Sequence, residues 1–571
     1  MAVMKLISGI FLTLLLLALP HDLFAQDATC TDAVDRDSSL TLSLPQRLKS
    51  ALSVGDYEKA YGYVLELEGA DSLSKATLRN CADCFIYVEK YDECLAFCER
   101  WEHRYPLRGL DSLFVPMRGE CYYYLGKYAR AVDYLARYRE QVEAKGKTLS
   151  VYYNGIYSVS LYESYRYEEA DSVFADYFYD YLKRAGLDIT QVFLSDNKDL
   201  LGQKLYLYAY NSFFMGEENK GMNLLYLSSK CGYDKATDDY NHLLNCETVL
   251  MELDLSRRTR NQFIEYLEKY DIDDVARVFP VPTNAAVDFW QQLMCRDASY
   301  VELQAELGKK RKRKMLQKAL DELQSGQNAL FLSLKRCAPF KPGEIESGLV
   351  RSLTGGSGIG ILDFRIYPAS DPNAFATPYG HIYLTSGLVL KYNFNNHLLL
   401  GVCAHEMTHF LCQHSLLNLW KQYEKERKRK IWGGIAAGLY AATMTATTMY
   451  GAANGVEYDQ SYYDNIGLTS TRLYDAITSE AYYFQFKYSR EQEIQSDLMA
   501  YRFCEAIGLG GYAYIMALQL LDENDLYMKS AKTDDHPTMA YRIAFLKYVY
   551  QRDRQAQQPG DEARRGAIVY D

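Results

Sequence analysis

Apolar residues recur with helical period from about residue 40 to residue 250, in segments separated by short polar turns. A tyrosine follows four of these turns, at positions 57, 91, 128 and 167, which are 34, 37 and 39 residues apart. After the third turn, Ala131, Tyr134 and Leu135 share one helical face. A repeat near 34 residues is typical of paired helices that stack into a solenoid.

The helical pattern continues through residues 255–335, so one helical region is predicted over residues 40–335. Its turns resemble those of tetratricopeptide repeats in degenerate form, for example the turn from Gly55 to Ala60. This resemblance implies a surface that binds a protein partner. An irregular helical bundle without a peptide-binding groove is the alternative that the pattern leaves open.

The pattern changes after Pro339. Two strand-like segments follow, at residues 359–367 and 380–386, and long helices then extend to about residue 550. A second domain is therefore predicted over residues 336–550. The whole chain is expected to be mainly α, with an N-terminal α-solenoid followed by an α+β domain that contains a small sheet. The polar tail, residues 551–571, is predicted to be disordered.

The first 25 residues have the pattern of a secretory signal peptide. Lys5 precedes an apolar run from Leu6 to Leu19, and Ala25 provides a small residue where cleavage is expected. The chain is therefore expected to be exported to the periplasm or cell envelope. An uncleaved membrane anchor is the alternative, although the apolar run is shorter than the roughly 20 residues that span a bilayer.

Charge and cysteine content narrow the classes of function. The net charge of −11 gives no electrostatic support for nucleic-acid binding, so no nucleic-acid partner is expected. All 13 cysteines follow the predicted signal peptide, and Cys81, Cys84, Cys94 and Cys98 form a local cluster. Because this cluster lies in a helical pattern, core packing or one disulfide is favoured over a second zinc site.

The strongest candidate for chemistry is an HExxH pattern in a predicted helix at residues 398–416. It contains His405, Glu406 and His409. Side chains four residues apart lie on the same face of a helix, so both imidazoles can bind one metal ion. Glu406 can accept the proton of a water molecule that attacks a peptide carbonyl. A catalytic zinc site also needs a third protein ligand and an open position.

A third ligand is predicted in the helical stretch from Ser489 to Asp497. Glu493 and Asp497 are four residues apart there and share a face. Glu493 would bind the metal, and Asp497 would accept a hydrogen bond from a ligand imidazole and so fix its tautomer. Considered alone, the stretch is better explained as a charged helix on the protein surface.

Four separated motifs, over about residues 335–550, resemble peptidase family M48. In order, they are Asn373-Ala374-Phe375-Ala376 with Gly380-His381-Ile382-Tyr383; His405 to His409, with His414 beyond; Glu493-x-x-x-Asp497; and His536-Pro537 with Arg542. The resemblance implies a gluzincin-like zincin fold, one zinc ion per chain, and endopeptidase activity on protein or peptide substrates. It also implies a strand that lines the cleft and pairs with extended substrate, formed by Asn373, Gly380, His381, Ile382 and Tyr383.

The last motif implies a regulatory or catalytic role. Pro537 suits the first turn of a helix, so His536 is expected on a loop just before it. By the family resemblance, His536 would cap the open position of the zinc at rest. Swung away, it would donate to the oxyanion together with Arg542. The alternative is a plain helix N-terminus, with Arg542 paired to a nearby carboxylate.

The chain departs from the family pattern in two places. Ser496 stands before Asp497, where alanine is usual in the family. A long insertion separates His409 from Glu493, and its apolar part, residues 431–453, is rich in Gly, Ala and Thr. We expect this part to form a helical hairpin or a cover near the cleft with peripheral membrane contact. A true membrane span is the alternative.

These features together predict an exported zinc endopeptidase of envelope protein quality control, with Glu406 as general base. The alternative is a non-catalytic repeat scaffold or chaperone with a protease-like domain. The presence of Glu406 argues against that alternative, because a chain without activity would most easily lose its base.

Overall fold

The computed structural model describes the chain in segments, which are residues 42–106, 109–252, 255–272, 285–296, 343–355, 363–367, 372–377, 380–418, 489–521 and 537–557, with single positions between 305 and 321. The predicted signal peptide, residues 431–453 and His536 lie outside these segments. The chain divides into two compact units, residues 1–237 and 238–571. The prediction of a mainly helical chain with one small sheet is confirmed.

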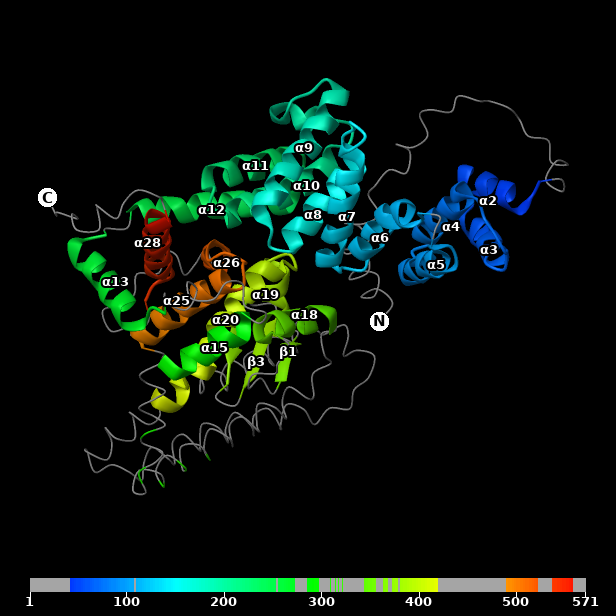
Figure 1. Ribbon diagram of the computed structural model, residues 1–571. Helices are drawn as coiled ribbons and strands as arrows, with labels where there is room; N and C mark the ends of the chain where they lie inside the picture. The colour runs from blue at the N-terminus through cyan, green and yellow to red at the C-terminus, as the bar shows by residue number, and fades with distance from the viewer. Residues whose placement is uncertain are drawn as a thin grey trace, which may run out of the picture. The chain divides into compact units, whose positions relative to one another are not determined.

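The described part of the first unit is a stack of helices in which each helix packs on the next in sequence (Figure 1). The helices are α2 Leu44–Ser53, α3 Tyr57–Leu67, α4 Lys75–Tyr87, α5 Tyr91–Arg104, α6 Asp111–Tyr124, α7 Tyr128–Glu143, α8 Val151–Glu163, α9 Tyr167–Ala185, the 3-10 helix η4 Ile189–Leu194, α10 Lys198–Phe214 and α11 Glu218–Lys230. The four tyrosines that mark the predicted repeat are the first residues of α3, α5, α7 and α9. Each predicted repeat therefore corresponds to one pair of helices. That this region binds a protein partner stays a prediction.

The turn inside each helix pair has the same backbone conformation. One residue, two positions before the second helix, has positive φ: Gly55 (76°), Glu89 (59°), Gly126 (66°) and Tyr165 (62°). The next residue then donates its N–H to a carbonyl five positions earlier, as Lys90 does to Phe85 at 2.8 Å. Glycine is favoured at such φ because it lacks a Cβ. Glu89 and Tyr165 adopt the same positive-φ conformation although neither is a glycine.

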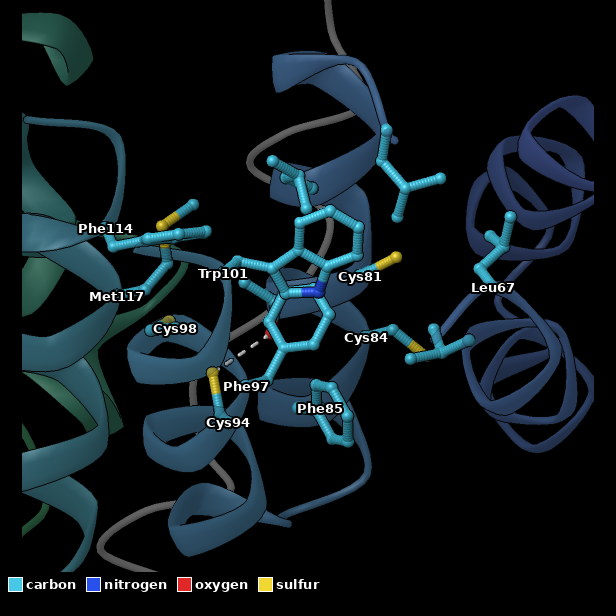
Figure 2. Packing of buried hydrophobic residues seen from close by; sticks show 14 of the residues in the cluster. Leu67, Cys81, Cys84, Phe85, Cys94, Phe97, Cys98, Trp101, Phe114 and Met117 are labelled. Carbon is cyan, nitrogen blue, oxygen red and sulfur yellow. Dashed lines mark hydrogen bonds between the residues drawn. The ribbon is translucent and has the colours of Figure 1, made fainter. Parts of the chain in front are cut away.

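The four clustered cysteines lie on α4 and α5, within the hydrophobic core that helices α2 to α6 form, among aromatic rings (Figure 2). None of the described cysteines forms a disulfide. Burial raises the pKa of Cys81 and Cys84 to about 12, which disfavours the thiolate that binds metal. No cysteine in the described part of the chain belongs to a group that could hold a metal ion. The structure therefore supports core packing rather than a disulfide or a second zinc site.

The second unit contains a three-stranded sheet beside a buried helix, α20 (Asn396–Leu411). Strand β3 (His381–Thr385) is central, with β1 (Asp363–Tyr367) parallel on one side and β2 (Ala374–Ala376) antiparallel on the other. This unit also contains the described helices α18 Gly343–Thr354, α19 Ser386–Lys391, α25 Arg490–Ala506, α26 Tyr512–Leu521 and α28 Met539–Gln557, besides α13 Arg257–Tyr270 and α15 Ala285–Arg296, and α12 Asp234–Glu252 lies at the division between the units. Helix α20 packs against α18, α25, α26 and β2, so it lies at the centre of this unit.

Two helices of the predicted repeat region have their contacts in the second unit. Phe263 of α13 (Arg257–Tyr270) lies edge-on against Tyr541 and Phe545 of α28, with ring centroids 5.2 and 5.3 Å apart. Trp290 of α15 (Ala285–Arg296) stacks on Phe503 of α25 at 4.7 Å. Through these aromatic contacts α13 and α15 belong to the second unit. The division between the compact units therefore lies before α13, within the helical region predicted over residues 40–335.

The end of the chain is helical further than its composition predicts. Helix α28 continues to Gln557, so residues 551–557 of the predicted disordered tail are helical. Asp553 provides a physical reason, because its carboxylate accepts hydrogen bonds from Arg502 at 2.5 Å and from Tyr501 at 3.1 Å. These bonds tie the last turns of α28 to α25. None of the described helices combines the length and apolar character that crossing a membrane requires.

Glu120 makes the stability of the first unit depend on pH. It is buried on α6 and accepts hydrogen bonds from Tyr152 and Tyr153 of α8. Burial raises its pKa from 4.5 to about 7. Between these values the folded state keeps a proton that the unfolded state has released. The free energy of unfolding therefore falls as the pH rises through this interval.

We predict that Glu120→Gln, which keeps an acceptor but cannot ionise, stabilises the unit by about 2–3 kcal/mol at pH 8 and has little effect near pH 5. Protection of the α6 and α8 amides from hydrogen exchange, compared with wild type at each pH, measures this difference. Glu66→Gln, at an exposed position of α3, is the control and should change neither value. An equal effect of Glu120→Gln at both pH values would contradict the prediction.

Candidate metal centre

Helix α20 brings the two histidines of the HExxH pattern together. Asn395 caps its N-terminus, because the Asn395 side chain accepts hydrogen bonds from the backbone N–H groups of His397 and Leu398. His405 and His409 lie one turn apart, and their Nε2 atoms are separated by 3.0 Å. Both side chains are buried. Two imidazole nitrogens therefore face one point inside the domain.

Helix α25 provides the carboxylate. Ser489 and Gln492 cap its N-terminus by reciprocal hydrogen bonds, so the helix begins at Arg490 and Glu493 lies in its first turns. Glu493 Oε2 lies 3.5 Å from His405 Nε2, and Oε1 lies 3.8 Å from His409 Nε2. The three ligand atoms lie within 4.8 Å of one another. Two imidazoles and one carboxylate fit a zinc ion and leave a fourth position for water or substrate.

Asp497 lies one turn after Glu493 and contacts the far side of the His405 ring. Its Oδ1 atom is 3.0 Å from His405 Nδ1 and is fully buried. A carboxylate at this place accepts a hydrogen bond from the Nδ1–H group and leaves the Nε2 lone pair directed at the metal position. The structure thus places Asp497 where the sequence analysis expects it.

His414 supports the second imidazole. It is fully buried, and its Nδ1 atom is 2.9 Å from His409 Nδ1. Its Nε2 atom lies 3.3 Å from Gln495 Oε1 of α25. His414 is therefore a buried neighbour of the His409 ring rather than a surface residue, and it does not belong to the group of three ligands.

Arg542 of α28 is paired with the two carboxylates of α25. Its Nε donates to Asp497 Oδ2 at 2.7 Å and its Nη2 donates to Oδ1 at 2.6 Å, while Nη1 lies 3.5 Å from Glu493 Oε2. This is the carboxylate pairing that the sequence analysis keeps as the alternative for Arg542. A role of Arg542 at the oxyanion stays a prediction, and His536 lies outside the described residues.

The charges in this site keep both carboxylates of α25 ionised. Burial acts to raise the pKa of Glu493, but the Arg542 guanidinium and His405 oppose it and lower that pKa to about 2. Burial also opposes ionisation of Asp497, yet Arg542 and His405 hold its pKa well below the usual range. Burial lowers the pKa of His405, and its hydrogen bonds with Asp497 and Glu493 more than compensate, raising it to about 9. Two ionised carboxylates therefore face the imidazoles.

Glu406 lies beside the three ligands and next to strand β2. Burial raises its pKa to about 7, while the charge of His405 and a hydrogen bond from the backbone of Ala376 act in the opposite direction. The hydrogen bond to Ala376 places the Glu406 carboxylate at the edge of the sheet. The Glu406 carboxylate thus lies near both strand β2 and the ligands His405 and Glu493.

The predicted substrate strand needs a correction. His381, Ile382 and Tyr383 belong to β3, which is hydrogen-bonded to β1 on one side and to β2 on the other. A substrate strand cannot pair with β3, because both of its edges are occupied. Asn373 comes immediately before β2, which is the edge strand nearest α20 among the described strands, and Gly380 comes immediately before β3.

The sequence analysis missed Tyr514 of α26. Its hydroxyl lies 2.9 Å from His405 Nδ1 and donates to Asp497 Oδ1 at 2.7 Å. No spacing rule connects Tyr514 to the HExxH helix, and it is one of 52 tyrosines in the chain. Only the packing of α26 against α20 brings it to the site.

One comparison with known proteins gives a match. Peptidase family M48 matches residues 362–550, which include the sheet, α20, α25, α26 and most of α28. Neither a curated protein nor a solved structure matches the chain.

The structure distinguishes Glu493 from Glu491, two carboxylates on the same helix. Glu491 is exposed and accepts hydrogen bonds from Lys269 at 2.6 Å and Tyr270 at 2.9 Å. We predict that Glu493→Ala loses bound zinc, because it removes one of three ligands, whereas Glu491→Ala keeps the wild-type zinc content. Elemental analysis of the dialysed proteins measures both. A zinc-depleted Glu491→Ala beside a zinc-replete Glu493→Ala would show that the wrong carboxylate has been chosen.

Proposed function

We propose that this chain is a zinc-dependent endopeptidase that cleaves protein or peptide substrates, because residues 362–550 match peptidase family M48, a family of metallopeptidases. The observation that carries the proposal is the convergence of His405, His409 and Glu493 within 4.8 Å, with Glu406 beside them. These three residues would hold the zinc ion. When bound, zinc supplies the Lewis acidity that activates water and polarises a peptide carbonyl.

The residues around the metal position have distinct tasks in this proposal. Glu406 accepts a proton from the attacking water and passes it to the amine that leaves when the peptide bond breaks. Asp497 holds the Nδ1 proton of His405, and Arg542 keeps Asp497 ionised through two hydrogen bonds. The dry interior strengthens these interactions, because little water screens them.

The edge of β2 that faces away from β3, which pairs with no other described strand, supports a way to bind the substrate. The two residues that flank β2 direct their backbone groups at strand β3. Thr377 donates its N–H to the His381 carbonyl at 2.8 Å, and the Asn373 carbonyl accepts a hydrogen bond from the Thr385 N–H at 3.0 Å. Since strand residues alternate, the backbone groups of Ala374 and Ala376 point to the opposite edge. The N–H of Ala374 donates to the Asn373 side chain at 2.8 Å, and that of Ala376 bonds to Glu406. The carbonyls of Ala374 and Ala376 are then directed at an incoming extended peptide.

Export, envelope protein quality control and membrane contact through residues 431–453 remain part of the proposal. The predicted signal peptide supports export, and the repeat-like stack of helix pairs supports a protein partner of the first unit. Recovery of chains lacking residues 1–25 from the periplasmic fraction is the expected result. Recovery of full-length chains from the cytoplasm alone would contradict it.

The test of catalysis is the variant Glu406→Gln. A neutral amide cannot accept the proton, so proteolysis of casein should fall by about 100-fold or more while zinc stays bound. Glu491→Gln is the matched control, because it makes the same chemical change on an exposed turn of α25. A chelator should abolish wild-type activity, and zinc should restore it.

Two results would contradict the proposal. Zinc-loaded wild type without activity would favour the non-catalytic scaffold, and wild-type turnover by Glu406→Gln would remove Glu406 from the mechanism.

A further inference from the structure

Tyr514 contacts both partners of the pair that orients the first metal ligand. It lies on α26, is 1% exposed, and its hydroxyl is 2.9 Å from His405 Nδ1 and 2.7 Å from Asp497 Oδ1. Its ring also lies nearly parallel to the imidazole of His405, with centroids 6.2 Å apart and planes inclined by 29°. The three side chains form a closed triangle, because Asp497 Oδ1 is 3.0 Å from His405 Nδ1.

The protons in this triangle can be placed by elimination. Asp497 is bonded to Arg542 through both oxygens and is ionised, so it only accepts hydrogen bonds. The Tyr514 hydroxyl therefore directs its proton at Asp497, and its oxygen is left as an acceptor. Arg542 Nη2 is also 3.5 Å from His405 Nδ1, but this contact is longer than its 2.6 Å hydrogen bond to Asp497 Oδ1. A proton on His405 Nδ1 satisfies both nearer acceptors, Asp497 Oδ1 and the Tyr514 oxygen, and directs the Nε2 lone pair at the metal position.

A glycine on α20 allows Tyr514 to come this close. Gly401 lies one turn before His405, and a Cβ placed there would be 2.8 Å from Tyr514 Cδ2 and 3.2 Å from its Cα. Neither distance is tolerated without movement of α26. The close packing of the two helices is thus a second observation, independent of the hydrogen bonds, that fixes the Tyr514 hydroxyl at the His405 ring.

We propose that Tyr514 is a positioning residue of the metal centre, which holds His405 in the tautomer and ring orientation that bind metal. This inference rests on the proposed function, since it takes His405 as a ligand. Tyr514 lies on the side of the His405 ring away from Nε2, so it acts through His405 and Asp497 rather than on the substrate.

Metal affinity tests the inference without any need for turnover. Tyr514→Phe keeps the ring and removes only the hydroxyl, so we expect Co²⁺ and Zn²⁺ to bind about 10-fold more weakly, as is typical when an outer partner of a ligand is lost. Titration of the full-length apoprotein with Co²⁺, followed by visible absorption, gives the affinity and reports the geometry around the ion. The absorption bands of the variant should shift, because His405 is no longer held by two acceptors.

The control is Tyr392→Phe. The Tyr392 hydroxyl is buried and donates to the Ala517 carbonyl of the same helix α26 at 2.7 Å. This variant loses a comparable hydrogen bond of α26 but none to His405 or Asp497, so it should lose stability but keep the wild-type Co²⁺ affinity and spectrum. An equal loss of affinity in both variants would show that Tyr514 acts only through the stability of α26, and would overturn the inference.

Gly401→Ala extends the test. It should weaken Co²⁺ binding in the wild type, but it should add little in the Tyr514→Phe background, where the hydroxyl is already absent. Additive effects would overturn the link between Gly401 and Tyr514. A wild-type protein that binds neither metal would refute the proposed function itself, whereas normal binding by both wild type and Tyr514→Phe would refute only the positioning role.

Discussion

The metal centre depends on the ion pairs that Arg542 makes with two carboxylates in the interior of the domain. Glu493 and Asp497 lie one turn apart on α25, and both are buried in their ionised form. Two like charges in such a place would repel each other and would favour protonation, which would remove a metal ligand and an acceptor at the same time. The guanidinium of Arg542 compensates for both, with a planar pair of donors that matches the Asp497 carboxylate. The metal site therefore requires that α28 packs against α25, in addition to the histidines that α20 supplies.

This requirement explains why the site is assembled from segments that are far apart in the chain. Helix α20 supplies the imidazoles, α25 the carboxylates, α26 the hydroxyl of Tyr514, and α28 the positive charge. The helices α13 and α15 support the same arrangement from outside: Asp271, at the end of α13, forms a buried ion pair with Arg502 at 2.8 Å, and Arg502 also holds Asp553 of α28. The position of α28 is thus fixed at two places along α25, one at the metal centre and one near the C-terminal end of the helix.

The sequence predicts those parts of the structure that depend on local spacing. The helical period predicts that His405 and His409 face one point, with Glu406 beside them. The repeat of helix pairs is predicted from the spacing of four tyrosines, at positions 57, 91, 128 and 167. The positive-φ turns are harder to predict from the sequence, because two of them have Glu89 and Tyr165 where glycine would be expected. The hydrogen bonds of the turn keep these two residues at positive φ. The order of strands, the choice of β2 as the edge and the contact of Tyr514 with His405 depend on tertiary packing, for which the sequence has no periodic signal. The helical residues 551–557 were also missed, since polar composition does not reveal that Asp553 has partners on α25.

The edge strand β2 has a consequence for what such a site would distinguish among proteins. It is only three residues long. In the proposed binding mode it would direct backbone carbonyls, rather than charged or shaped side chains, at a peptide bound beside it. Recognition of this kind responds to the main chain of the bound segment and is nearly indifferent to the order of its amino acids. A segment whose N–H groups are already used in its own helix or sheet has nothing to donate, and a proline at the wrong position has no N–H at all. The site would therefore sort polypeptides by conformation, accepting chains that have lost their structure and sparing the same sequences when they are folded.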